Sequence, residues 1–263
     1  MRIGSPQRRF FSLSCASFLL VTSLAAQSLN GCLSARLLES NLAKGAAQIL
    51  VESRCPNRVT AYALSADCPA PAGSSRECGK LIVDFWPSIG LGHLLPSDRA
   101  DEAGGIRPGK DHVSLVGISR PDTVAALELP PVVRVTAYVL EDLTAFGDTR
   151  IVGEILRKRA ASLSELLHWR GILKAEVSRM RAQGLEQVDV RPLRGRGRVE
   201  SYQASARLAA QVIGEEVFAR MKPARAPDGE SEIADLENIE ACLRFLEMRI
   251  QNGSGHVPKE LLQ

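Results

Sequence analysis

The pattern of apolar and polar positions divides the chain into three parts. Residues 10–26 are almost wholly apolar or small. Residues 55–147 contain short alternating runs separated by Pro- and Gly-containing segments, a pattern typical of β-strands. Residues 148–263 repeat apolar positions every three or four residues, as amphipathic helices do. The sequence therefore predicts an α+β fold, with a short-stranded sheet region followed by a mainly helical C-terminal region.

Two of the predicted strands share a sequence. The strand candidates in the middle part are residues 58–64, 80–86, 112–119 and 132–140. Residues 58–64 read Arg-Val-Thr-Ala-Tyr-Ala-Leu, and residues 134–140 repeat this with Val in place of the second Ala. Both copies alternate in the manner of a strand. The repeat indicates either two copies of a strand unit, adjacent in one sheet, or a coincidence among common residue types.

Helices are predicted on both sides of the strands. Apolar residues at helical spacing predict an amphipathic helix over residues 35–52. Asp148 is suited to cap a helix that runs to about residue 160. Ser162 and Glu165 have the spacing of a capping box for a second helix, which Gly184 would end.

The last part of the chain predicts a short strand and two further helices. The strand covers residues 187–190, and Ser201 is placed to cap a helix that runs to residue 220. The side chains expected to face inward from that helix are Leu208, Val212, Ile213 and Val217. Residues 222–230 have the composition of a linker. Ser231 then caps a helix whose apolar seam we expect to pack on its own domain.

The apolar run at the N-terminus is an export signal. It follows a start with three arginines and no acidic residue, and it is shorter than the ~20 apolar residues that a membrane-spanning helix needs. Leu29-Asn30-Gly31-Cys32 comes next and resembles the lipobox of bacterial lipoprotein precursors, with Asn30 at a position that is usually small. The resemblance implies removal of residues 1–31 and attachment of fatty acyl chains, such as palmitate, to Cys32.

A lipidated Cys32 implies a location in the cell envelope. Several acyl chains hold a protein at a bilayer far more firmly than one does. Leu33 is not the Asp that favours inner-membrane retention in enteric lipoproteins, so an outer-membrane anchor is favoured. The alternatives are cleavage after Ala25, which gives a soluble periplasmic or secreted chain, a twin-arginine signal at residues 8–11, and a mitochondrial transit peptide.

Cysteines indicate disulfides in an oxidising compartment. Lipidation of Cys32 and removal of Cys15 leave four cysteines, an even number. Cys68 and Cys78 flank a turn and form the easiest pair, which leaves Cys55 to pair with Cys242. Three connectivities remain open. Cleavage after Ala25 would instead leave five cysteines, one of them unpaired. No metal site is predicted, because the four histidines show no ligand spacing to the cysteines.

Charge excludes one class of partner. The chain has 33 basic and 30 acidic residues, and the signal segment contains three of the arginines, so the mature chain has 30 of each. We therefore expect no nucleic-acid partner. Nothing in the sequence calls for a cofactor. The expected partners are the bilayer through Cys32, other envelope proteins and peptidoglycan.

An arginine-rich segment is the main candidate for binding anions. Arg194, Arg196 and Arg198 crowd this segment, and the alternative is a solvated loop balanced by nearby acids. Residues 202–212 resemble the Tyr-Asn and Ser-x-Arg-x-Ala motifs of the OmpA-like peptidoglycan-binding domain. That resemblance implies that Arg207 contacts a diaminopimelate carboxylate. The family's His-Thr-Asp is replaced by Arg-Pro-Leu at residues 191–193.

Signals of catalysis are sparse. His93 lies in the long Pro- and Gly-rich stretch of residues 87–109 and is a weak candidate for a catalytic residue. The function predicted from the sequence is a structural or adaptor role for a membrane-anchored envelope lipoprotein, in a secretion, pilus-type or cell-wall assembly. A peptidoglycan-binding module that uses Arg207 is one alternative. An exported hydrolase that uses the 87–109 stretch is the other.

Overall fold

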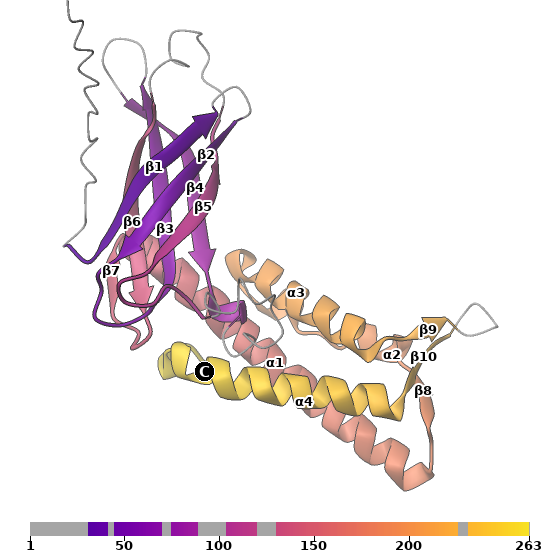
Figure 1. The fold of residues 1–263 in the computed structure, drawn as a ribbon. Helices are drawn as coiled ribbons and strands as arrows, with labels where there is room; N and C mark the ends of the chain where they lie inside the picture. Colours follow the sequence, from indigo (N-terminus) through magenta and orange to yellow (C-terminus); the bar gives the residue numbers. More distant parts are fainter. Residues whose placement is uncertain are drawn as a thin grey trace, which may run out of the picture.

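A β-sandwich and a helical unit make up the fold, and a helix shared by both joins them (Figure 1). The computed structural model describes residues 31–41, 45–69, 75–88, 104–119, 130–225 and 231–262. The strands lie mainly in the N-terminal half and the long helices in the C-terminal half. The predicted α+β class is therefore confirmed. Cys15, Leu29, Asn30 and His93 lie outside the described residues.

Two antiparallel sheets form the sandwich. The first has the order β1-β2-β5 and the second the order β4-β3-β6-β7. Their strands are β1 (Leu33–Asn41), β2 (Ala46–Ser53), β3 (Val59–Pro69), β4 (Ser75–Asp84), β5 (Asp111–Gly117), β6 (Val132–Leu140) and β7 (Ala145–Gly147). Side chains such as Ile49, Val51, Tyr62, Leu64 and Val135 pack between the two sheets. The four strands predicted for this region are all present.

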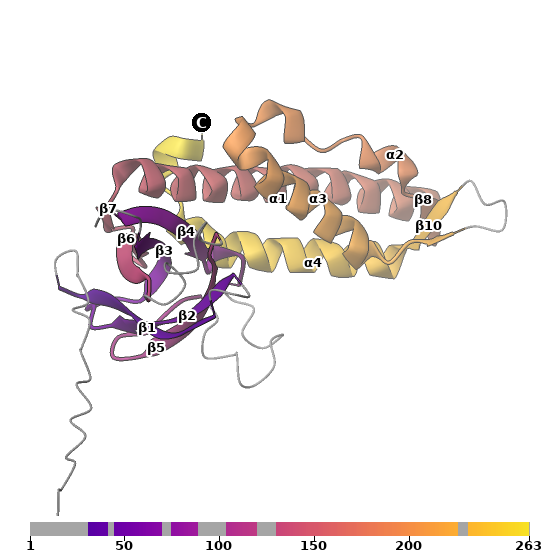
Figure 2. The same cartoon turned by 90° about the horizontal axis from the view of Figure 1, so that it is seen from above.

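The first helix covers the outer face of the second sheet, as the view from above shows (Figure 2). This helix is α1 (Thr149–Gln183). Ala61, Ala63 and Ala137 face it from β3 and β6, and Ile151 and Ile155 pack against them. Small side chains on the sheet let the helix approach its backbone. The sandwich and α1 therefore form three layers.

The repeated heptapeptide forms the centre of the second sheet. β3 and β6 pair antiparallel, with Tyr62 opposite Tyr138, the equivalent residue of the other copy. The pairing register shifts twice, and the additional residue of each bulge is a threonine, Thr60 in one strand and Thr136 in the other. These threonines are also equivalent in the repeat. The pairing agrees with the first of the two interpretations, two copies adjacent in one sheet, and the pair has a local two-fold pseudosymmetry.

The amphipathic helix predicted over residues 35–52 is wrong. This stretch forms the hairpin of β1 and β2, in which Leu37 lies opposite Ile49. The register of that hairpin shifts between Leu37 and Glu39, which interrupts the alternation of apolar positions. The interrupted pattern resembles the three- and four-residue spacing of a helix, although Ala35 and Ile49 face the sandwich core.

One helix replaces the two that were predicted between residues 148 and 183. Asp148 caps its start, since its Oδ1 accepts the backbone N–H groups of Arg150 (2.8 Å) and Ile151 (3.2 Å). Gly184 ends it with a left-handed φ of 65°. Both termini are as predicted. The capping box is wrong, because Ser162 and Glu165 are buried inside the continuous helix.

The second half of α1 packs with two further helices. They are α3 (Ala204–Met221) and α4 (Leu236–Gly253), preceded by the short α2 (Arg191–Arg194). A small sheet of order β8-β10-β9 closes the far end; its strands are β8 (Gln187–Asp189), β9 (Ala224–Arg225) and β10 (Glu232–Asp235). Among the described residues, no helix has the length and apolarity needed to cross a bilayer.

Several details of the helical unit differ from the prediction. α3 begins at Ala204, after a 3-10 turn that contains Ser201. Residues 232–235 form β10, so Ser231 does not cap α4. Ile213 and Val217 point into the helical core as expected. Two other expected core residues are exposed, Leu208 (69%) and Val212 (50%). The seam of α4 packs within the same chain, as predicted.

Candidate functional site: a buried arginine junction and an arginine-lined pocket

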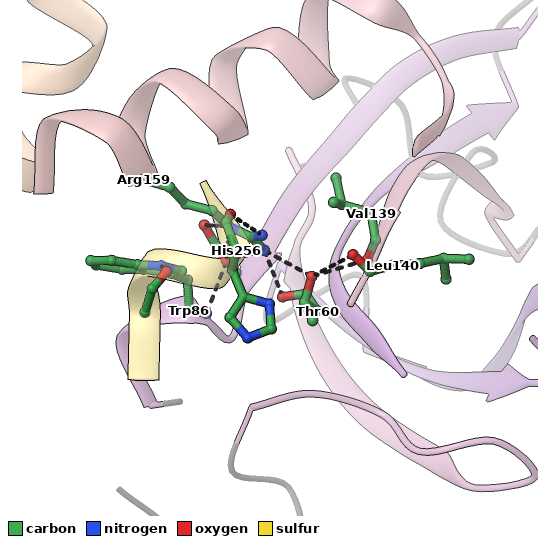
Figure 3. A network of polar contacts seen from close by, with 8 residues as sticks. Thr60, Trp86, Val139, Leu140, Arg159 and His256 are labelled. Carbon is green, nitrogen blue, oxygen red and sulfur yellow. Dashed lines mark hydrogen bonds and ion pairs between the residues drawn. The ribbon is translucent and has the colours of Figure 1, made fainter. Parts of the chain in front are cut away.

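Arg159 joins the sandwich to the helical unit (Figure 3). Its side chain lies on α1 and is completely buried. Nε lies 3.1 Å from each carboxylate oxygen of Asp84, at the end of β4. Nη2 lies 2.8 Å from Oδ1 of Asp84, 3.0 Å from the carbonyl oxygen of Thr60 and 3.2 Å from its hydroxyl. One guanidinium group thus holds two strands against the helix.

The C-terminal segment completes this junction. Nη1 of Arg159 donates to the carbonyl oxygen of His256 at 3.4 Å. The indole Nε1 of Trp86 donates to the carbonyl oxygen of Gly253 at 3.0 Å. A Cβ on Gly253 would lie 2.9 Å from the Trp86 ring, so this close approach requires glycine. The backbone N–H of Trp86 in turn donates to Asp84 (3.0 Å). Four segments distant in sequence meet here.

No pattern in the sequence marks Arg159 as special. It follows Lys158 in a helix rich in basic residues. Helical periodicity alone does not indicate that a charged residue will be buried or which residue will pair with it. Burying a guanidinium group requires a carboxylate and further acceptors. Those acceptors come from Asp84 and Thr60, which are 75 and 99 residues away in the chain. Only the packing of α1 on the sheet reveals the junction.

Both disulfides lie in the sandwich. Cys68 and Cys78 join β3 to β4, which confirms the expected pair. Cys32 pairs with Cys55, with their Cα atoms 4.6 Å apart. The expected Cys55–Cys242 pair is therefore wrong. Cys242 belongs to the helical core, whereas Cys55 belongs to the sandwich core.

The disulfide of Cys32 bears on the predicted lipid anchor. One sulfur atom cannot form both a disulfide and a thioether to a lipid, so the disulfide in the structure and the predicted lipid anchor exclude each other. In the structure Sγ of Cys32 lies 3.2 Å from the hydroxyl of Tyr138, whose pKa is raised by burial. The chain passes directly from Cys32 into β1 at Leu33. Cys32 is thus part of the folded sandwich.

Two of the four arginines expected to bind anions have acidic partners within the described residues. Arg194 pairs with Glu232 (2.6 Å) and lies over the ring of Phe218. Arg207, the residue suggested by the peptidoglycan-binding resemblance, pairs with Glu200 at 3.1 Å. Its Nε also donates to the backbone carbonyl of Tyr202. These contacts occupy Arg194 and Arg207 with structural roles.

Arg198 borders a pocket of about 410 Å³. One wall comes from α1 with Arg157, a second from the segment that leads into α3, and a third from the C-terminal Leu261 and Leu262. Within the described ranges, neither Arg157 nor Arg198 has a carboxylate within ion-pair distance. Arg196 is exposed in the same segment but does not line the pocket.

Glu165 holds one wall of this pocket in place. Its side chain is completely buried in α1. Oε1 accepts the backbone N–H of Arg198 at 3.2 Å, and Oε2 accepts the hydroxyl of Tyr202 at 3.0 Å. Burial raises the pKa of Tyr202, which keeps this hydroxyl protonated as a donor. Gly197 allows the approach, because a Cβ there would lie 3.2 Å from Oε1.

His93 lies outside the described residues, so its proposed catalytic role stays a prediction. Within the described ranges, no group of three His, Cys, Asp or Glu side chains is placed to hold a metal ion. Comparison with protein-family models, with curated proteins and with solved structures finds no match.

Proposed function

We propose that this chain is an exported envelope protein with a structural or adaptor role, and that its mature form keeps Cys32 in a disulfide. The observation that carries the adaptor role is the buried junction at Arg159. It joins α1 to Thr60 and Asp84 of the sandwich, so the two units keep one relative orientation. A protein that holds partners at a set separation needs such a junction.

The dimensions of the helix support the same role. A helix of 35 residues is about 50 Å long, and only its first part covers the sandwich (Figure 1). The small sheet lies at the opposite end of the helical unit. The protein therefore has two distant surfaces, one on the sandwich and one at the small sheet, joined by a continuous helix.

Export is supported by the apolar N-terminal run and by the two disulfides, because disulfides persist in oxidising compartments. If Cys32 forms a disulfide, the signal peptide must be cleaved at a position before Cys32. Cleavage after Ala25, one of the alternatives considered for the sequence, meets this condition. The five mature cysteines then form two pairs and leave Cys242 buried. This assignment explains the odd number without a lipid.

Intact mass of the protein from its native envelope tests the export part. We expect a chain that starts at Ala26, lacks acyl groups and is lighter than the reduced chain by four hydrogens. A mass that corresponds to an acylated chain starting at Cys32 would overturn this assignment and establish the lipid anchor.

Photo-crosslinking in cells tests the adaptor role. A crosslinking residue is placed at Leu115, on the exposed face of β5, and in a second strain at Leu185, beyond the end of α1. We expect discrete envelope adducts from each position. Arg159→Met should reduce the adducts, while Arg150→Met, an exposed control on the same helix that lies outside both the junction and the pocket, should not. Absence of adducts from both positions would contradict the adaptor role.

A further inference from the structure

The pocket between α1 and the start of α3 has the dimensions of a small-molecule site. Its volume of about 410 Å³ falls within the usual range of roughly 300–1,000 Å³ for ligand pockets. Three segments of chain meet around it, and all three belong to one folded unit. None of the contacts that hold the junction at Arg159 is part of it.

Two guanidinium groups set the charge of this pocket. Arg157 and Arg198 line it from different segments, and neither has an acidic partner in the parts of the chain that the structure describes. In the same region Arg194 and Arg207 are both paired. Two guanidinium groups that line one pocket without acidic partners favour the binding of an anion there. Their planar donor geometry suits a carboxylate or phosphate group.

The nearest buried carboxylate does not neutralise the site. Glu165 lies behind the wall, and its oxygens accept Arg198 N–H and the Tyr202 hydroxyl. With that charge counted against Arg157 and Arg198, one positive charge remains in excess. The carboxylate therefore orders the wall and leaves the pocket attractive to a single anionic group.

Further donors line the pocket near the start of α3. The side-chain amide of Gln203 is among them, whereas the hydroxyl of the neighbouring Ser201 already donates to the carbonyl oxygen of Arg198 at 2.6 Å. Gln203 occupies the N-cap position of this 18-residue helix, and no side chain caps it. The first backbone N–H groups of a helix without a cap favour negative charge. This feature adds to the two arginines and is not required for the charge argument.

The wall formed by the C-terminal residues is apolar. Leu261 and Leu262 lie there with 41% and 39% of their surfaces exposed, and Ala160 and Ala161 of α1 and Ala206 of α3 add apolar lining. An inorganic anion would leave this wall unused. A ligand with an apolar chain would cover it and bury its methylene groups away from water.

We propose that this pocket binds a small amphipathic anion, with a carboxylate or phosphate head held by Arg157 and Arg198 and a short apolar chain against Leu261 and Leu262. A carboxylate and a phosphate both present anionic oxygens that accept hydrogen bonds from guanidinium groups, and the experiment determines which of the two binds more tightly. The proposal is independent of the adaptor role, since it requires only the helical unit and the C-terminal segment.

Calorimetric titration of the purified, oxidised protein with hexanoate and with hexyl phosphate tests the proposal. We expect at least one of them to bind, and the one that binds more tightly identifies the head group. Arg157→Gln and Arg198→Gln should each weaken binding at least tenfold, because each removes a charge-assisted hydrogen bond to the anion. Arg196→Gln, in the same segment but outside the pocket, should bind as the wild type does.

Neutral and purely inorganic probes complete the test. Hexanamide, which has the same chain without the charge, and inorganic phosphate, which lacks the chain, should both bind at least tenfold more weakly. Equal melting temperatures of the variants show that they fold. The proposal is overturned if neither hexanoate nor hexyl phosphate binds, or if hexanamide binds as tightly as these anions. It is also overturned if a variant that combines Arg157→Gln and Arg198→Gln keeps the wild-type affinity.

Discussion

Thr60 and Thr136 occupy equivalent places in the repeated heptapeptide, and each is the additional residue of a β-bulge between β3 and β6. Both bulges connect the sheet to α1. The carbonyl oxygen of Thr136 accepts the backbone N–H of Asp148, the N-cap, at 2.9 Å. The carbonyl oxygen of Thr60 accepts Nη2 of Arg159, about three helical turns later. The local two-fold thus gives the helix two attachment points.

The hydroxyl groups of these threonines differ, and this difference is testable. The Thr60 hydroxyl lies 3.2 Å from the Val139 carbonyl oxygen and contacts Arg159. The Thr136 hydroxyl oxygen is buried and has no hydrogen-bond partner among the described residues. Thr60→Val should lower the free energy of unfolding by about 1–3 kcal/mol, whereas Thr136→Val should leave it unchanged or raise it. Urea denaturation measures both. Equal losses would contradict this assignment.

A pair of glycines tests the connection between β7 and α1. Gly147 has a φ of +94°, and a Cβ there would lie 2.2 Å from the carbonyl oxygen of Thr136. Gly147→Ala should therefore cost about 2 kcal/mol or more. Gly171 lies on the exposed side of α1 with no atom within 4 Å of such a Cβ. Gly171→Ala should stabilise the protein by about 0.5–1 kcal/mol. Thermal denaturation distinguishes them, and a stable Gly147→Ala variant would refute the close contact.

Acid should weaken the junction through His256. Burial lowers the pKa of His256 below 6.5, and Arg159 and Arg58 lower it further, while Glu141 and Asp84 act in the opposite direction. Its Nδ1 is buried and has no hydrogen-bond partner in the described ranges. The unfolded chain therefore binds this proton more readily than the folded protein does. The stability contributed by neutral His256 is complete above pH 6.5 and is lost as the pH falls through the folded pKa.

Denaturation as a function of pH measures this effect. Between pH 6.5 and 5, the free energy of unfolding should change less steeply with pH in His256→Gln than in the wild type. The two slopes should differ by at most about 1.4 kcal/mol per pH unit, the value for one proton. His168→Gln serves as the control, because His168 lies away from the junction and contacts the carbonyl oxygen of Arg196. The same slope in the wild type and in His256→Gln would contradict this linkage.

Cys242 should be inert in the folded protein. Burial raises the pKa of its thiol to about 12, so almost no reactive thiolate exists near neutral pH. Iodoacetamide at pH 8 should label Cys242 only after denaturation. Non-reducing peptide mapping should show Cys32–Cys55 and Cys68–Cys78 links, and Cys242→Ala should retain both. A peptide that links Cys55 to Cys242 would contradict the structure.

Local signals in the sequence located the features that depend on neighbouring residues. Asp148 starts α1 and Gly184 ends it because caps satisfy backbone groups within a turn or two. The Cys68–Cys78 pair spans one hairpin. The same local reasoning failed at Ser162 and Glu165, where the helix continues because burial on both sides supports it. It also failed at residues 35–52, where a bulge imitates helical spacing.

By itself the sequence determined the α+β class and the strand candidates, since these follow from periodicity along the chain, and it offered the adjacency of the two heptapeptide copies as one of two interpretations. Only the tertiary structure decided the partner of Cys55, the burial of Arg159 and the union of Arg157 with Arg198 at one pocket. The physical reason is that the residues next to a charged group or a thiol in the sequence do not indicate which distant residue will be its partner. The partners lie far apart in the sequence and come together only when α1 packs on the sheet and the C-terminal segment packs against α1.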